Sequence, residues 1–579
     1  MFRSKNAKFL NQNLFYFILL FISPTIIFIV QDMTPMYFNN DDYFLKQLVS
    51  GEFTGTPDPH LVHIGYLSGV LISHLYKFLP TVPWYGLFMF GYAFLATVLS
   101  FGTFLKCTKK IWQKVALTIF SLCVMYGFLF SHLLQIQFTT VTAIVCAAAM
   151  VHFYTAKDEA NLPAYLRKQI PSLLLFCISM ELRSNACIMF LPMFIFLGIA
   201  RLLQNRSMKK VLLTYGCIVV GLTIVLLGID KLAYSSDSWQ TFIQYSNDRA
   251  AIVDYEDYPP YEENMETYQT LGLSEASYVA AKDGYMLLLD SHIDANFMET
   301  VKNISPDSTS TVSEIVNAFI TMHKEPQYDW PINRIVFLLY ACGVFMILLC
   351  GKYSCLWDIA AVFGGRMIIW IYILYIGRPL PRVTQGIYIA ELLLLLAIFF
   401  HHKLWHPKND KLQLPKAVLS AGILSGVVLL SARWGFHYVE SIHSKNDVLE
   451  TASTTYSEVY EYMLDHQENF YLLDVWSFID LTEPVFSAPL NQANNFTLLG
   501  GWTANSPWTD VIRQNQGFTT FEQATLERDN VFFVFQNEPD TPYTYLEDYY
   551  RDKHPETTIE VYDTFTTSTG VEFLILECN

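Results

Sequence analysis

The chain has 579 residues, of which 52% are hydrophobic, 16% are aromatic and only 16% are charged. A soluble multidomain protein of this length carries more charge and fewer apolar residues, so the composition excludes that class and predicts a multispanning membrane protein. With a net charge of −16, no nucleic-acid partner is expected.

The charges are strongly segregated along the chain. Residues 237–330 carry 17 acids and 4 bases, residues 440–579 carry 24 acids and 5 bases, and the rest of the chain carries 12 acids and 28 bases. Because Lys and Arg mark the cytoplasmic loops of membrane proteins, both acidic regions are expected on the outer side of the plasma membrane.

The first apolar segment, residues 13–30, is expected to remain as a membrane anchor. It has no small-residue cleavage site of the kind that ends a signal peptide. Three basic residues precede it and predict a cytoplasmic N-terminus: Arg3, Lys5 and Lys8.

An outer loop, residues 31–82, follows the first span. Asn40 is a suitable N-cap for a short helix predicted from Tyr43 to Val49. The apolar run from His63 to Leu79 is interrupted by polar residues and stops at a proline, which favours a helix lying along the membrane interface.

Eleven spans are predicted in all, and an odd number places the C-terminal region outside. The sequence therefore predicts a polytopic α-helical membrane domain, residues 1–435, followed by a small extracytoplasmic α/β domain, residues 436–579. Beyond the first span, the others are predicted at 83–105, 112–132, 137–154, 169–181, 184–202, 211–229, 332–350, 357–377, 384–401 and 415–432.

Two polar regions should have structure of their own. The outer loop 231–331 is predicted to be mostly helical, with Ser274 capping one helix. In the C-terminal domain, buried strands are predicted at 470–475, 531–535 and 571–576, and helices near 445–466 and 542–553. No Gly-rich phosphate loop or C-x-x-C pattern occurs in that domain.

Asp41 and Asp42 are the candidate chemical centre. Two adjacent carboxylates at the membrane rim, in a chain of apolar helices, point to a site that takes a proton or holds a cation. The structural alternative is that both acids favour the positive end of the short helix that follows.

Three arginines near the outer ends of spans are candidate anion-binding residues. Lys and Arg normally favour cytoplasmic loops, but Arg378 and Arg382 both lie in one predicted outer loop that two prolines stiffen. Arg183 occupies a tight outer turn. Guanidinium groups suit bidentate binding of phosphate oxygens. The alternatives are contact with lipid headgroups or pairing with an acid of a neighbouring loop, which for Arg183 would be Glu181.

Two charges lie within predicted spans at matching depth. Arg366 and Glu391 are about 12 and 15 Å from the inner face at 1.5 Å per helical residue. Since their helices are antiparallel neighbours, we predict a structural ion pair between them.

Metal binding is a further hypothesis for the first outer loop. His60 and His63, with Asp58 and the paired acids, offer imidazole and carboxylate ligands for a divalent cation. The alternative is that these histidines only form hydrogen bonds in an aromatic loop.

This combination resembles the membrane glycosyltransferases of the GT-C superfamily: an acidic first outer loop with an interfacial helix, many spans and an outer C-terminal domain. The residue match is limited to Asp41, Asp42 and their loop. The resemblance implies inverting transfer of a hexosyl or pentosyl group from a polyprenyl-phosphate sugar to a glycan, lipid or other acceptor. Asp41 or Asp42 would activate the acceptor hydroxyl, the arginines would meet the leaving phosphate, and Asn40 and His60 would contact substrate.

Other functions stay open at this stage. A polysaccharide polymerase or ligase that uses a lipid-linked oligosaccharide would depend on Arg378 and Arg382 rather than on a carboxylate. A transporter is expected to show internal repeats and several charges at the midplane, and no clear repeat is present. A non-enzymatic scaffold would be indifferent to Asp41 and Asp42.

Overall fold

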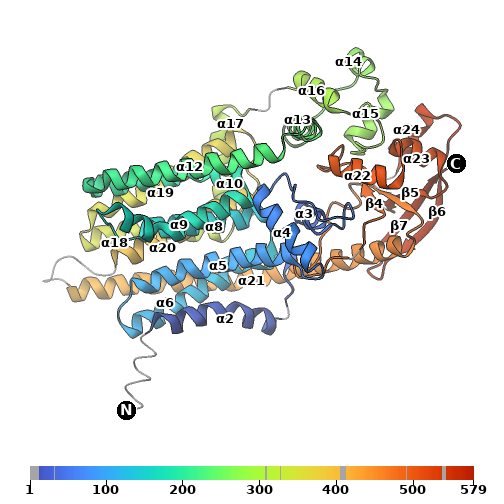
Figure 1. Ribbon diagram of the computed structural model, residues 1–579. Helices are drawn as coiled ribbons and strands as arrows, with labels where there is room; N and C mark the ends of the chain where they lie inside the picture. Colours follow the sequence, from blue (N-terminus) through green and yellow to red (C-terminus); the bar gives the residue numbers. More distant parts are fainter. Residues whose placement is uncertain are drawn as a thin grey trace.

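The computed structural model describes residues 12–31, 33–306, 309–325, 328–404, 413–490, 492–537 and 543–579. It has a body of long, roughly aligned helices. At one end of this body lie the first outer loop, the helices of a long second loop and a mixed α/β domain (Figure 1). We call this end the domain end, and the opposite end the far end.

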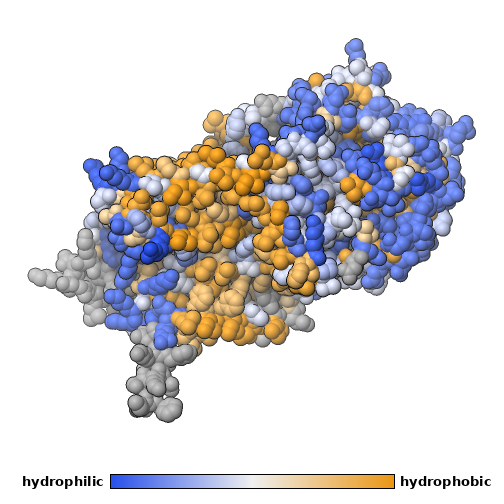
Figure 2. Space-filling model, in the orientation of Figure 1, coloured by the Kyte–Doolittle hydropathy of each residue, from blue (hydrophilic) through white to orange (hydrophobic). Residues whose placement is uncertain are grey.

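Among the described residues, eight helices are long and apolar enough to cross a membrane. A broad apolar surface covers the helical body, and the domain end is hydrophilic (Figure 2). The protein is therefore a multi-pass membrane protein. The eight are Trp84–Lys106 (α5), Ile111–Leu134 (α6, η1 and α7), Phe138–Thr155 (α8), Ser184–Gln204 (α10 and α11), Arg206–Ala233 (η2 and α12), Ile332–Cys350 (α18), Tyr353–Tyr375 (η4 and α19) and Pro381–His402 (α20).

The other three expected spans also fall on helices. They lie in α2 (Asn13–Gln31), α9 (Leu162–Leu182) and α21 (Gln413–Asp465). The last is one continuous helix of 53 residues that contains both the expected span at 415–432 and the expected helix at 445–466. The membrane segment and the C-terminal domain are thus joined by a single helix.

Helices α8 and α20 form the centre of the body and are almost entirely buried. They approach closely because Gly386 faces Ala143, and a Cβ at Gly386 would meet the Ala143 Cβ at 2.8 Å. Since α8 also packs against α5 and α9, most of the helical body is organised around it.

The predicted ion pair is confirmed. Arg366 Nε lies 3.0 Å from Glu391 Oε1, and both side chains are fully buried between α19 and α20. The Tyr340 hydroxyl donates to the same carboxylate at 2.7 Å, and the guanidinium also contacts His323. Charged groups at this depth need such partners because water is excluded.

The first outer loop folds into α3 (Asn40–Ser50) and α4 (Tyr66–Phe78). The prediction for α3 was wrong at its start: the helix begins at Asn40, and Asn39 is the N-cap residue, without a side-chain cap hydrogen bond. The helix begins three residues before its first apolar position, Tyr43, which brings both aspartates into the first turn. Before α3, the short strand β1 (Met36–Tyr37) pairs with β2 (Gln135–Ile136) next to the start of α8.

The second loop is mostly helical, as predicted. Ser274 accepts a hydrogen bond from the Ser277 backbone N–H and caps the third of its α-helices. The elements are α13 (Asp237–Ala251), η3 (Ile252–Glu256), α14 (Met265–Thr270), α15 (Glu275–Lys282), α16 (Ala295–Ile304) and α17 (Val312–Lys324).

The C-terminal domain contains a five-stranded mixed sheet in the order β4-β3-β5-β7-β6. The three predicted strands correspond to β3 (Phe470–Leu473), β5 (Val531–Gln536) and β7 (Glu572–Cys578), and the helix expected near 542–553 is α24 (Thr544–Lys553). The remaining elements are β4 (Phe496–Leu498), β6 (Ile559–Thr566), α22 (Pro507–Gln516) and α23 (Phe521–Glu527).

The C-terminal domain is fixed to the first outer loop by backbone pairing and by a buried ion cluster. The Tyr37 N–H donates to the Glu483 carbonyl at 3.1 Å. Lys46 Nζ lies 2.7 Å from Glu52 and 3.1 Å from Glu483. Because Lys46 lies on α3, this cluster holds the helix that begins with the two aspartates.

Candidate functional site

Asp42 is fully buried at the start of α3. The Tyr85 hydroxyl donates to its Oδ1 at 2.8 Å, and the Phe138 backbone N–H donates to its Oδ2 at 3.3 Å. Phe138 is the first residue of α8, so the carboxyl accepts from one of the N–H groups that a helix start leaves unpaired. Burial raises the pKa of Asp42 to about 8, although these two hydrogen bonds oppose the shift. Asp42 therefore joins α3 to α5 and α8, and burial favours its protonated form.

Asp41 remains accessible, with 21% of its side chain exposed. The Asn39 amide donates to Asp41 Oδ2 at 3.1 Å, and Arg382 Nη1 lies 3.5 Å from the same oxygen. The two residues are separated by 341 positions in the chain. The fold therefore brings together an acid and a base that the sequence predicted only to share an outer interface.

Arg183 lies between α9 and α10, half-buried, with its guanidinium 4.7 Å from the centre of the Phe138 ring. It donates to the Thr139 hydroxyl. None of the ion pairs among the described residues involves Arg183, and Glu181, its expected partner, instead accepts from the Ser68 N–H at 3.0 Å. Burial, with the charge of Arg382 next, lowers the pKa of Arg183 to about 10. This guanidinium is charged at neutral pH and lacks a carboxylate in contact.

Arg378 differs from Arg183 in having an acidic partner. Its Nη1 lies 3.1 Å from Asp254 Oδ2, and its guanidinium stands 4.7 Å from the centre of the Tyr255 ring. Both partners belong to η3 of the second loop. The long loop therefore reaches the arginine-bearing end of α20.

A groove of about 620 Å³ connects the three arginines with the apolar surface of the helical body. We call it the arginine groove. Its polar end is formed by Arg183, Arg378 and Arg382 with Thr139 and Tyr255. Its apolar wall comes from α10, α11 and the second half of α19, namely Ala186, Ile188, Met189, Pro192, Ile368, Ile369, Tyr372, Ile373 and Ile376.

A second, smaller cavity of about 240 Å³ shares Arg382 with the arginine groove. We call it the polar pocket. Asp329 lines it: its Oδ1 accepts from Thr384 at 2.8 Å, and its buried Oδ2 has no hydrogen-bond partner among the residues that the structure describes. Burial raises the pKa of Asp329 to about 6. Other polar lining residues are Ser131, His132, Gln135, Gln137, Thr140, Tyr328, Gln385, Tyr438 and Lys445.

Asp41 and Asp42 line neither of these two cavities, and neither do the remaining candidates from the sequence. His60 contacts Asp58 at 2.8 Å and stacks on Trp239 with ring centres 4.7 Å apart, so it belongs to an aromatic cluster. Asn40 lies beside Asp41 in the first turn of α3 and lines neither cavity. His63 is half-buried beside Phe138, and burial, with the charge of Arg183 next, lowers its pKa to about 4.

Three site residues were missed by the sequence interpretation. Thr139 begins a span and Tyr255 lies in a loop, and neither has a signal of its own in the sequence. Asp329, three residues before a span, was a detectable signal because a carboxylate at a membrane rim is unusual.

The described residues contain one group of His, Cys, Asp or Glu side chains placed to hold a metal ion: Cys355, Asp358 and His402. The set expected around His60 and His63 does not form such a group within the described residues. The cluster that does form lies at the far end of the body, about 30 Å along α20 from Arg382 at 1.5 Å per residue.

No family model matches the sequence, and no curated protein matches it. Two solved structures are similar to this one: ArnT from Cupriavidus metallidurans in the apo state (TM-score 0.46) and the same protein bound to undecaprenyl phosphate (TM-score 0.38). Each is 10% identical, and each match covers 96% of this chain and 97% of the other. At this identity and these scores, the likeness does not bear on substrate or mechanism.

Proposed function

We propose that this protein is a membrane glycosyltransferase that moves a sugar from a polyprenyl-phosphate donor to a hydroxyl-bearing glycan, lipid or other acceptor. The observation that carries the proposal is the Arg183 guanidinium, which lines an apolar groove and has no carboxylate in contact among the described residues. A cation held in this way fits a ligand that brings its own negative charge together with a long apolar chain.

The donor fits the arginine groove as a lipid phosphate. The wall formed by α10, α11 and α19 is apolar where the helices cross the membrane, so a prenyl chain can enter sideways from the bilayer. The phosphate then meets Arg183 and Arg382, with Arg378 beside them. Guanidinium groups bind phosphate oxygens in a bidentate manner and stabilise the charge that a departing phosphate gains.

The acceptor fits the polar pocket. Hydroxyl, amide and carboxyl groups line it, and the unpaired Oδ2 of Asp329 can accept a hydrogen bond from a sugar hydroxyl. Because Arg382 lines both cavities and lies beside Asp41, the two substrates would meet next to this carboxylate.

Asp41 acts as the general base in this proposal. It takes the proton of the acceptor hydroxyl as the oxygen attacks the anomeric carbon. The bond from that carbon to the phosphate oxygen breaks, and its electron pair leaves with the polyprenyl phosphate. Attack from the face opposite the leaving group inverts the anomeric centre. Asp42, which is buried and accepts from Tyr85 and Phe138, positions α3 rather than taking the proton.

The charge distribution supports an orientation for the reaction. With the N-terminus in the cytoplasm, the acidic second loop and C-terminal domain lie outside, and so does the domain end with both cavities. The sugar would then be transferred on the outer face of the plasma membrane.

The test uses the purified chain in lipid nanodiscs with a panel of polyprenyl-phosphate sugars. Binding of polyprenyl phosphate is measured by native mass spectrometry for the wild type, Arg183→Gln and the control Arg433→Gln, an exposed arginine of α21. We expect Arg183→Gln to weaken binding by about ten- to a hundredfold, the cost of losing a charged hydrogen bond, while the control binds as the wild type does.

Two results would contradict the proposal. Equal binding by wild type and Arg183→Gln would remove the lipid-phosphate site. Transfer only from a lipid-linked oligosaccharide pyrophosphate, unaffected by Asp41→Asn, would instead favour the polymerase or ligase reaction.

A further inference from the structure

Three potential metal ligands from two helices meet at the far end of the body. Cys355 ends η4 (Tyr353–Cys355), Asp358 lies in the first turn of α19, and His402 is the last residue of α20. Positions three apart share a face at a helix start, so Cys355 and Asp358 both face the end of α20. The chain thus places a thiol, a carboxylate and an imidazole where the two helices must be held together.

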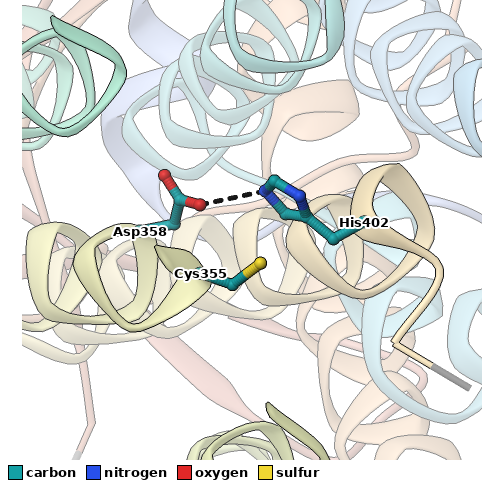
Figure 3. Close-up of side chains that lie close together, drawn as sticks. All are labelled: Cys355, Asp358 and His402. Atoms are coloured by element: carbon teal, nitrogen blue, oxygen red, sulfur yellow. Dashed lines mark hydrogen bonds and ion pairs between the residues drawn. The ribbon is translucent and has the colours of Figure 1, made fainter. Parts of the chain in front are cut away.

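We propose that Cys355, Asp358 and His402 bind a divalent transition-metal ion, with zinc favoured by the ligand set. Their ligand atoms all lie within 4.8 Å of one another, and Asp358 and Cys355 both approach the His402 ring (Figure 3). Thiolate, imidazole and carboxylate are the ligands that zinc takes in proteins.

The spacing is close to that of a tetrahedral site. Normal zinc–ligand bonds place neighbouring ligand atoms about 3.4–3.6 Å apart. His402 Nε2 and Asp358 Oδ2 are 2.9 Å apart in a hydrogen bond, so they separate by about half an ångström when the ion replaces the shared proton. Such a change is small for side chains at helix ends.

Burial and charge also favour the ion. Asp358 is fully buried and Cys355 is almost fully buried. A thiolate and a carboxylate balance the two positive charges of zinc, so the occupied site is neutral, which lowers the cost of burying each charge.

The surrounding contacts are those that support metal ligands. Gln204 Nε2 donates to Asp358 Oδ1 at 2.8 Å and leaves Oδ2 for the ion. The Tyr154 hydroxyl lies 2.8 Å from His402 Nε2, the nitrogen that faces Asp358, so this hydrogen bond is given up when Nε2 binds the ion. Lys352 donates to the His402 carbonyl at 2.6 Å and fixes the end of α20. Such partners orient ligands and raise metal affinity.

The experiment measures the metal content of the full chain by mass spectrometry. The protein is produced in zinc-supplemented medium and purified in the presence of a weak chelator. The variants are Cys355→Ser and His402→Gln. The matched control is Cys350→Ser, a buried cysteine five residues away whose thiol donates to the Leu404 carbonyl, a bond that serine can keep. We expect about one zinc per chain in the wild type and the control, and a loss of most of it in both variants.

A second measurement uses only the wild type, so its result does not depend on whether a variant folds. Exchange of zinc for Co²⁺ should produce a near-ultraviolet thiolate-to-cobalt band, and a strong chelator should lower the thermal unfolding midpoint. A wild type without stoichiometric metal and without the cobalt band would leave only an Asp358–His402 ion pair and overturn the proposal. Full metal content in both variants would do the same.

Discussion

Replacing Glu391 with glutamine leaves the Arg366 guanidinium inside the helical body without its carboxylate. At the 3.0 Å separation and an effective dielectric constant of about 20, the lost Coulomb attraction is about 5.5 kcal/mol. Glutamine can still accept from Tyr340, and the guanidinium keeps its contact with His323. We therefore expect Glu391→Gln to reduce the free energy of unfolding by about 3–5 kcal/mol.

The double variant Glu391→Gln with Arg366→Met separates this cause from a general packing defect. Removing both charges leaves no unpaired group, so stability should return to within about 1 kcal/mol of the wild type. The assay is reversible unfolding in mixed micelles for the two single variants and the double variant, which together give the coupling energy.

An exposed ion pair supplies the control for this cycle. Lys168 of α9 pairs with Glu159 of the preceding loop at 3.0 Å, with side chains 41% and 36% exposed, so Glu159→Gln should cost less than about 1 kcal/mol. The reasoning is refuted if Glu391→Gln costs no more than Glu159→Gln, or if adding Arg366→Met restores nothing.

Three further predictions follow from the described contacts. The pKa of Asp42 is about 8 in the folded protein and about 3.9 in the unfolded chain. The folded state therefore holds the proton more tightly, and the contribution of Asp42 to stability falls as the pH rises from about 4 to 8. The decrease is at most about 1.4 kcal/mol per pH unit. Asp42→Asn should remove that slope from unfolding curves measured across this range. Arg378→Ala should weaken polyprenyl-phosphate binding less than Arg183→Gln does, because Asp254 already balances the charge of Arg378; equal losses in the same binding assay would contradict this. Lys46→Met leaves the buried Glu52 and the half-buried Glu483 carboxylates facing each other, so it should loosen the C-terminal domain, and limited proteolysis should show faster cleavage near residue 483 than in wild type.

The pattern of apolar residues, and the depth of charged residues along each predicted span, were sufficient to predict much of the helical body. Arg366 and Glu391 could be paired from the sequence because depth along a helix follows directly from residue counts. The strands β3, β5 and β7 were predictable because their central positions are apolar and buried. By contrast, β6 is an edge strand whose residues are mostly exposed, and β4 has only three residues, so neither leaves an apolar run.

The site was only partly predictable, for a physical reason. A sequence can indicate that Asp41, Arg183 and Arg382 share an interface, since each lies at the outer end of a predicted span. It cannot indicate which acid is buried, because that depends on Tyr85 and Phe138, which belong to other helices. The same limit explains why the capping residue of α3 was misplaced by one position.

The most direct test of the central claim is the rate of glycosyl transfer by Asp41→Asn, measured with a donor that the wild type uses. The account predicts that this variant binds polyprenyl phosphate as the wild type does but transfers sugar about 10²–10⁴ times more slowly, which is the usual contribution of a general base. A rate within a few-fold of the wild type, with binding unchanged, would contradict the assignment of Asp41 as the base.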